Sequence, residues 1–279
     1  MPTEKRQRQK EGRRARLEAQ RKVDKRRQFT RRAVIVVIVA AIVVGSVYLL
    51  TRSSNKSAAA TTTTTTSTTT TTTLPPHFAH QQAVVDAIAA AAGCPKLPST
   101  PTNTLSWPQA PMGNINITGK YSAVFKTDIG SFTVALDASK APITVNNFIF
   151  LVKSGYYKCG SFFRVIPGFA SQSGSPNQTN RNTAQPGYTI PDENKQSKFA
   201  LGDLAMANTG GPHTGGSQFF IVAKAQTIGG TYALFGHVTH GLAVINKINA
   251  DGNANTYPDG SSYPPNVTHR ILKITIVGP

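Results

Sequence analysis

The sequence has little cysteine and no recognisable cluster of metal ligands. Only two cysteines, Cys94 and Cys159, occur in 279 residues, and neither belongs to a Cys-x-x-Cys pair. This excludes the usual patterns of a structural zinc site. Five histidines show no ligand spacing on an expected helix: His77, His80, His213, His237 and His240. We therefore expect no metal and no cofactor.

A phosphate-binding loop is also absent. Glycine pairs occur at 210–211 and 215–216, but no Gly-Lys-Ser/Thr follows them and no strand-to-helix context surrounds them. These glycines indicate turns.

Acidic residues are scarce, since 12 Asp and Glu stand against 30 Lys and Arg, for a formal charge of +18. The excess is concentrated in residues 1–32, which hold 14 Lys and Arg and 4 acidic residues. Because this stretch has almost no apolar periodicity, we interpret it as a disordered basic tail. It sets membrane topology or, alternatively, binds anionic lipid. No folded basic domain is seen, so no nucleic acid partner is expected.

Long apolar runs are limited to one, AVIVVIVAAIVVGSVYLL at residues 33–50. As a helix rising about 1.5 Å per residue it covers roughly 27 Å of a hydrocarbon core of about 30 Å. The basic tail and Arg32 predict a single-pass membrane protein with a cytoplasmic N-terminus and the remainder extracytoplasmic. A cleaved secretory signal is the alternative, because residues 58–60 offer a small-residue cleavage site. The lengths of the basic and apolar regions favour the uncleaved anchor.

Residues 51–76 are of low complexity, with a run of twelve threonines at 61–73 interrupted only by Ser67, and predict a linker between the membrane and a domain. Residues 77–118 are interpreted as an extracytoplasmic extension. Within them QQAVVDAIAAAA at 81–92 predicts a short helix that ends at Gly93.

Both cysteines follow the apolar run, so they lie in a compartment where a disulfide can persist. A structural bridge between Cys94 and Cys159 is the favoured interpretation, and two free thiols are the alternative.

From residue 119 the pattern becomes that of a folded domain. Helices are expected from Pro142 to Gly155, with Val145, Phe148, Ile149 and Val152 on one face, and within 241–248. Strand-like runs occur at 121–128, 130–137, 162–166, 200–207, 218–222 and 270–277. Many short strands and two helices predict a mainly β domain, either an antiparallel barrel or a sandwich.

Three motifs in this domain resemble those of the cyclophilins, the peptidyl-prolyl cis/trans isomerases. They are FFRVIPGFASQSG at 162–174, LAMANTGGPHTGGSQFFI at 204–221 and LFGHVTHGLAVINKI at 234–248. The resemblance implies that residues 119–279 form a closed eight-stranded antiparallel β-barrel capped by two helices. It also implies isomerisation of X-Pro bonds, here in exported proteins, with proline-containing polypeptides as partners. A monomer is expected.

Arg164 is a lone cation among apolar residues of the first motif. By itself it could be a structural residue that pairs with an acid such as Asp203. The resemblance implies instead that Arg164 is catalytic and that Gln172 positions it. It further implies a substrate-binding set, of which the phenylalanines alone would otherwise be taken for core: Phe169, Ala170, Ala207, Asn208, Gln218, Phe220, Ile228 and Tyr232.

The chain departs from the family pattern at the pocket. Ala170 stands where the best-known members carry methionine, and Tyr232 where many carry histidine. Where many carry tryptophan, this chain has Thr227 or a gap, with Ile228 as the nearest apolar wall; weak binding of the family's inhibitor cyclosporin is therefore expected. These departures sustain the alternative of a low-turnover proline-peptide-binding module or chaperone at the cell surface.

Overall fold

The computed structural model describes residues 75–97, 101–113, 115–177, 186–256 and 262–279. The predicted basic tail, the membrane span at 33–50 and nearly all of the threonine-rich linker lie outside these residues. Among the helices that the structure does describe, none combines the length and hydropathy needed to cross a bilayer.

The N-terminal extension begins with a longer helix than the sequence predicts. Helix α2 spans Pro76–Ala91, so it starts five residues before the expected position and takes in the last residue assigned to the linker. Proline is well suited to the first turn of a helix, because its φ is already helical and its missing N–H has no partner there. The helix ends as predicted, since Gly93 adopts a φ of +76°.

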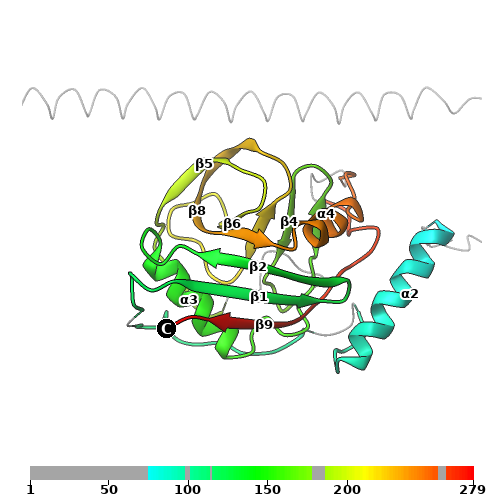
Figure 1. Ribbon diagram of the computed structural model, residues 1–279, viewed down its shortest axis with the longest axis horizontal. Coiled ribbons are helices and arrows are strands. Elements are labelled where there is room, and N and C mark those ends of the chain that lie inside the picture. Colours follow the sequence, from blue (N-terminus) through cyan, green and yellow to red (C-terminus); the bar gives the residue numbers. More distant parts are fainter. Residues whose placement is uncertain (1–74, 98–100, 114, 178–185, 257–261) are drawn as a thin grey trace, which may run out of the picture. The chain divides into compact units, whose positions relative to one another are not determined.

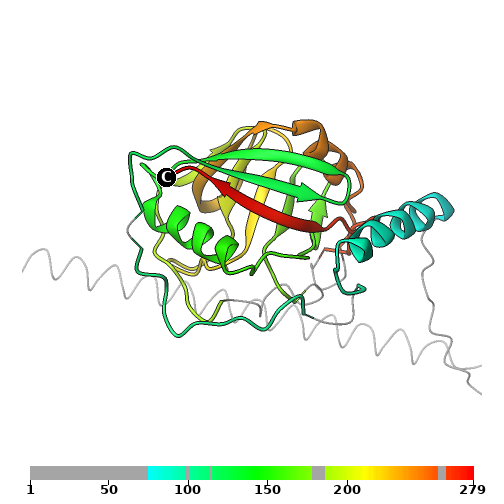
Figure 2. The same cartoon turned by 60° about the horizontal axis from the view of Figure 1, so that its bottom comes forward.

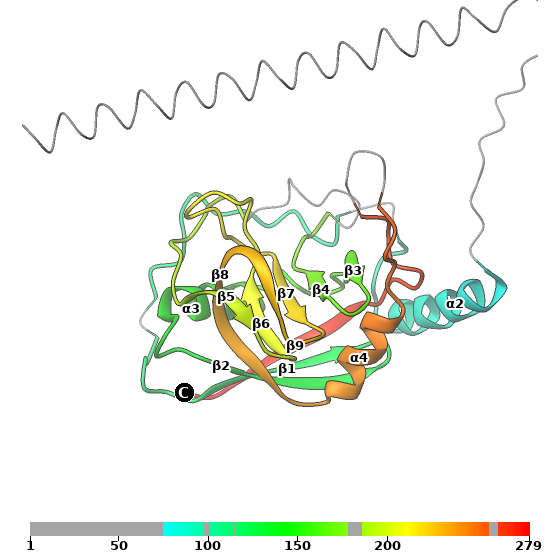
Figure 3. The same ribbon diagram turned by 90° about the horizontal axis from the view of Figure 1, so that it is seen from above.

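One antiparallel sheet forms the body of the domain (Figures 1 and 3). Its strands are β1 Tyr121–Thr127, β2 Gly130–Leu136, β3 Arg164–Ile166, β4 Ala170–Ser173, β5 Lys195–Phe199, β6 Asp203–Met206, β7 Phe219–Val222, β8 Gln226–His240 and β9 Ile271–Val277. Eight of them follow the path β3-β4-β7-β6-β8-β2-β1-β9, and β5 pairs with β8 beside that path. The domain is thus mainly β, and its antiparallel sheet has eight strands in its path. Strand β5 is a ninth, which the resemblance did not imply.

The two ends of the path meet just before β3 and β9. Ser161 and Arg270 form an isolated antiparallel bridge, and the Ile271 N–H donates to the Gly160 carbonyl at 2.7 Å. Within the described residues, β9 beyond Ile271 pairs through its backbone with β1 alone. The curled sheet is therefore joined to itself at one point, and the rest of β9 is an edge.

Two helices pack on this sheet, as expected. Helix α3, Pro142–Lys153, packs against β8 and β9, and helix α4, Leu242–Ala250, packs against β2, β3 and β4. They lie at opposite ends of the curled sheet (Figures 1 and 3). On α3 the predicted apolar face is confirmed, because Val145, Phe148 and Ile149 are buried.

A disulfide joins the extension to the domain, which confirms the favoured pairing. Cys94 and Cys159 are bonded, with their Cα atoms 5.3 Å apart. Hydrogen bonds from α2 add to this attachment: the Thr268 N–H donates to the Gln82 Oε1 at 2.7 Å. Helix α2 consequently lies beside the start of β9 (Figure 2).

A buried charge cluster lies at the same place. His269 is 1% exposed, and its Nδ1 and Nε2 lie 3.0 and 2.9 Å from carboxylate oxygens of Asp128 and Asp251. Each oxygen can only accept, so both ring nitrogens must carry protons. Burial alone would lower the pKa of His269, but the hydrogen bonds and charges of the two aspartates outweigh it and raise that pKa. The extension contacts this cluster, because the Gln81 Nε2 donates to Asp251 at 2.7 Å.

Candidate active site

Strands β3 and β4 form a short hairpin that carries the two residues at the centre of the candidate site. Arg164 and Gln172 are directly opposite each other in its register, so their side chains lie on one face. The connecting turn requires Gly168, whose φ of +71° is costly for other residues. Asn249 at the end of α4 holds this turn, because its side chain accepts from the Gly168 N–H at 2.8 Å and donates to the Ile166 carbonyl at 3.0 Å.

The guanidinium of Arg164 is half-buried and fixed from several sides. Its Nε donates to the Ser262 Oγ at 3.1 Å, and its Nη1 lies 3.4 Å from the Gln172 Oε1. Its Cζ lies 5.8 Å from the centroid of the Phe169 ring, within range of a cation–π contact. Asp203, the acid considered as a structural partner, is engaged elsewhere: its carboxylate lies 2.8 Å from the His237 Nδ1.

Gln172 connects Arg164 to a third side chain. The Gln172 Nε2 donates to the Gln218 Oε1 at 3.0 Å, while its Oε1 faces the arginine. Gln218 is 7% exposed and lies behind Gln172, outside the set that lines the cavity. Its carbonyl accepts from the Ala207 N–H at 2.9 Å, so it also holds the segment that follows β6.

A cavity of about 250 Å³ opens in front of these residues. It is lined by nine of the ten residues expected from the sequence, and Gln218 is the exception: Arg164, Phe169, Ala170, Gln172, Ala207, Asn208, Phe220, Ile228 and Tyr232. They come from β3, β4, β7, β8, the β3–β4 turn and the segment after β6, so sequence-distant motifs converge on one space.

The apolar wall of the cavity belongs to a small hydrophobic cluster apart from the main core. Phe220 meets Tyr232 edge to face, with ring centroids 5.2 Å apart, and Phe199 packs against Phe220 at 6.0 Å. Ala170 and Ile228 are buried in the same cluster. Phe220 is therefore both a core residue and a wall of the cavity, and Phe199 supports it from behind.

The rim is shaped by Asn208 and Tyr232. The Asn208 side chain donates to the Thr231 carbonyl at 3.0 Å and accepts from the Gly210 N–H at 3.0 Å, which ties the segment after β6 to β8. The Tyr232 hydroxyl donates to the Gly229 carbonyl at 3.3 Å. Thr227 is exposed and does not line the cavity, whereas Ile228 does.

Three residues that contact or support the site were not predicted from the sequence. Ser262, Asn249 and Phe199 contact or support the predicted set, yet each lies outside the quoted motifs. Asn249 directly follows the third motif, so a search along α4 for a buried polar residue could have found it. The other two are brought in only by the tertiary fold.

The chemistry available in the cavity is limited. Of the described residues that line it, only Arg164 is charged at neutral pH, and none is a carboxylate, cysteine or histidine. Apart from Tyr232, whose hydroxyl donates to the Gly229 carbonyl, the described lining offers none of the usual nucleophiles or general bases. The arrangement instead suits a non-covalent reaction in which an apolar group is held beside a fixed cationic donor.

Comparison with known proteins agrees with this description. Residues 122–276 match the model of the family described as cyclophilin type peptidyl-prolyl cis-trans isomerase/CLD. Peptidyl-prolyl cis-trans isomerase B of Bacillus subtilis is 48% identical over 105 residues, which cover 37% of this chain and 71% of the relative. Peptidyl-prolyl cis-trans isomerase-like 1 of Emericella nidulans is 41% identical over 128 residues, which cover 44% and 78%. A crystal structure of a cyclophilin type isomerase from Cryptosporidium parvum superposes with a TM-score of 0.50 at 29% identity, covering 57% of this chain and 98% of that one.

Proposed function

The chain belongs to the cyclophilin family and is a peptidyl-prolyl cis-trans isomerase, and from this premise we propose that Arg164 is the catalytic residue and that the enzyme acts on X-Pro bonds of exported polypeptides outside the membrane. The observation that carries the assignment of the site is the convergence of nine expected residues, Arg164 among them, on one cavity.

The reaction requires stabilisation of a twisted amide. Resonance between the nitrogen lone pair and the carbonyl makes rotation cost about 18–20 kcal/mol. At the top of this barrier the nitrogen is pyramidal and its lone pair accepts a hydrogen bond better than in the planar state. A donor aimed at that nitrogen therefore binds the transition state more tightly than the ground state, which is the condition for catalysis.

Arg164 has the properties of this donor. The guanidinium is permanently charged, planar and able to donate in a fixed fork. Its contacts with Ser262 and Gln172 orient the group before substrate arrives, so little reorganisation is needed during the reaction. Gln172 is then a positioning residue, with Gln218 behind it.

The remaining residues bind the substrate. Phe169, Phe220 and Ile228 form an apolar pocket for the proline ring, with Ala170 at its base and Tyr232 at its rim. Ala207 and Asn208 also line the cavity, and their main chain would hold the residue before proline. This division supplies a grip on the ring and an anchor for the flanking backbone, between which the bond rotates.

The proposal is tested by the isomerisation of a short X-Pro peptide by the full chain in uncharged detergent. Arg164→Ala should lower kcat/KM by about 10²–10³, the loss typical for a preorganised donor in an active site. Arg164→Lys is the matched variant, because it keeps the charge and loses the fork. If Arg164→Ala retains wild-type turnover while its circular dichroism spectrum is unchanged, Arg164 is not the catalytic residue.

The smaller Ala170 gives the alternative function a specific basis, since a loosely held proline ring would favour binding over turnover. A folded wild-type chain that binds proline peptides without accelerating isomerisation would favour that alternative.

We also propose a domain organisation that positions the isomerase domain outside the membrane. Residues 1–32 form a cytoplasmic basic tail, residues 33–50 a membrane anchor, residues up to Leu74 a linker, and the extension and the isomerase domain follow outside the membrane. The disulfide between Cys94 and Cys159 supports an oxidising compartment for the domain. Protease added to intact cells should digest the domain; a domain that is protected until the cells are lysed would contradict this topology.

A further inference from the structure

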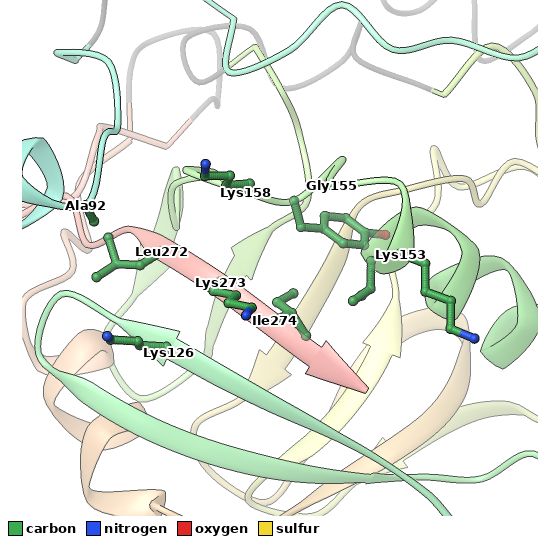
Figure 4. Close-up of a pocket in the computed structure, with 10 residues that line it drawn as sticks. Ala92, Lys126, Lys153, Gly155, Lys158, Leu272, Lys273 and Ile274 are labelled. Atoms are coloured by element: carbon green, nitrogen blue, oxygen red, sulfur yellow. The ribbon is translucent and has the colours of Figure 1, made fainter. Parts of the chain in front are cut away.

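A second cavity, of about 480 Å³, lies between the end of α3, the turn after it, and strands β1 and β9. Four lysines line it, Lys126, Lys153, Lys158 and Lys273, and we call it the basic groove. Figure 4 shows their side chains on several sides of the same space. Its volume lies within the range of about 300–1,000 Å³ that is typical of ligand sites. It shares no lining residue with the cavity beside Arg164.

The positions of two of these lysines lower the stability of the fold. Lys126 and Lys273 are directly opposite each other in the pairing of β1 with β9, and like charges at such positions are destabilising. Within the described part of the chain, lysine ion pairs are formed by Lys140 and Lys247, and by none of the four lysines of the groove. Their positive charge is therefore not neutralised internally. Such a broken local rule is expected at functional or strained sites.

The floor of the groove is apolar. Leu272 and Ile274 are 7% and 9% exposed, and Val152 is half-buried beside them. Tyr157 also lines the groove, and its hydroxyl donates to the Ser217 carbonyl at 2.9 Å. Burial raises the pKa of Tyr157, so this residue is a neutral wall. The groove thus combines a cationic rim with an apolar floor, which fits a ligand that has both acidic and apolar groups.

The groove runs along an unpaired strand edge. At the start of β9, the Ile271 N–H and carbonyl bond to Gly160 and Cys159. From Leu272 onwards the described residues give β9 no backbone partner on that side, and Lys273 and Ile274 line the groove there. Such an edge accepts an added strand through main-chain hydrogen bonds, which favours a polypeptide over a lipid headgroup.

The walls of the groove are held by the disulfide. Ala92 lines the groove two residues before Cys94, and Lys158 lines it one residue before Cys159. The bridge therefore fixes one end of the groove. This preorganisation reduces the entropy that a ligand must lose on binding.

We propose that the basic groove binds an extended acidic polypeptide segment, which adds as a strand to the edge of β9 and places its Asp or Glu side chains among the four lysines. A second copy of this chain is a poor occupant, because it would bring the same lysines to the contact. The site goes beyond the proposed isomerisation, since it needs no proline and uses none of the catalytic residues.

Binding is measured by fluorescence anisotropy of a labelled, proline-free peptide of alternating Glu and Val with the full chain in uncharged detergent. The triple variant Lys126→Glu/Lys158→Glu/Lys273→Glu should weaken binding about tenfold or more, because three favourable charge contacts become repulsive. The matched control is Lys195→Glu/Lys198→Glu/Lys224→Glu, which changes three exposed lysines outside the groove by the same total charge. Equal weakening by both variants would mean that net charge or the basic tail binds the peptide, and would overturn the proposal.

Two further arms test the mode of binding. A peptide with N-methyl groups at alternate residues cannot form the added strand and should bind at least tenfold more weakly; undiminished binding would overturn strand addition. Vesicles containing phosphatidylglycerol serve as the competing occupant. If the groove variant loses vesicle binding and keeps peptide binding, the groove is a membrane contact and the proposal is wrong.

A single substitution separates a binding role from a structural one. Lys273→Gln removes one of two opposed charges, so it should raise the thermal midpoint of unfolding while it weakens peptide binding. Isomerisation of a neutral X-Pro peptide should be unchanged in this variant, which shows that the fold is intact. Weaker binding together with a lower midpoint would instead indicate a structural role for Lys273. Failure of the proposed isomerisation would appear only in the assay on the X-Pro peptide. The proposed function and the proposed peptide binding can therefore fail separately.

Discussion

Arg164 and Gln172 face each other across the β3–β4 hairpin, with the arginine Nη1 3.4 Å from the glutamine Oε1. Gln172→Ala should therefore lower kcat/KM by roughly tenfold or more, because a hydrogen bond to a charged group contributes about 1.5–3 kcal/mol and each 1.4 kcal/mol changes a rate tenfold. Steady-state kinetics on an X-Pro peptide measure the loss.

The control for this positioning role is the double variant Arg164→Ala/Gln172→Ala, compared with Arg164→Ala alone. If Gln172 acts through the arginine, it should have little further effect once the arginine is gone. An equal loss in both backgrounds would show that Gln172 acts directly on substrate.

The buried cluster at His269 predicts a pH dependence of stability. Because the folded state raises the pKa of His269 above its ordinary value of 6.5, the protonated ring stabilises the fold fully below pH 6.5. This contribution is lost as the pH rises through the raised pKa. The free energy of unfolding, measured by urea titration from pH 5 to pH 9, should therefore fall with rising pH.

His269→Gln is the control for this dependence. It removes the titrating group between Asp128 and Asp251, so the slope with pH should flatten and the protein should be less stable by about 3–5 kcal/mol, the cost of breaking a buried ion pair. A wild-type stability that rises with pH over this window would contradict the assignment of a protonated ring.

The disulfide predicts a difference between stability and activity. Cys94 and Cys159 are 65 residues apart, and a loop of that length contributes about 4 kcal/mol by constraining the unfolded chain. The Cys94→Ser/Cys159→Ser variant should lose stability of this order in urea titration. Its kcat/KM on a short peptide should be retained, since neither cysteine lines the catalytic cavity; a matching loss of activity would show that the extension supports the site.

The pocket predicts weak inhibition by cyclosporin. By the resemblance, the tryptophan that the inhibitor contacts in the family is replaced by Thr227 or a gap; Thr227 is exposed, and Ile228 is the nearest apolar residue of the cavity. Isothermal titration with the wild-type chain should give a Kd in the micromolar range or weaker. Sub-micromolar binding would refute the expectation, and Thr227→Trp should tighten binding if the missing ring is the cause.

Much of the catalytic cavity was predictable because its residues lie within continuous motifs. The run from Phe162 to Gly174 places Arg164, Phe169 and Gln172 on one hairpin, and the order of motifs predicts that Phe220 meets them. Apolar periodicity also located β1, β2 and the apolar face of α3, since each of those elements buries mainly one side.

The remaining features depend on contacts between distant segments. Ser262 and Asn249 are ordinary polar residues in the sequence, and only the fold brings them to the hairpin. The role of His269 is not evident in the sequence, because its partners Asp128 and Asp251 are 141 and 18 residues away along the chain. Strand β5 has little apolar alternation, and its identity as a strand is decided by pairing with β8.

The bridge between Cys94 and Cys159 also closes residues 94–159 into a covalent ring that contains β1, β2 and α3. A secreted protease that cuts the proline-containing stretch between residues 101 and 113 would leave both fragments linked, because the cut lies inside the ring. If residues 33–50 anchor the chain as proposed, cleavage there would not shed the domain into the medium while the bridge is oxidised. Release would require a second cut, on the N-terminal side of Cys94, or a reductant.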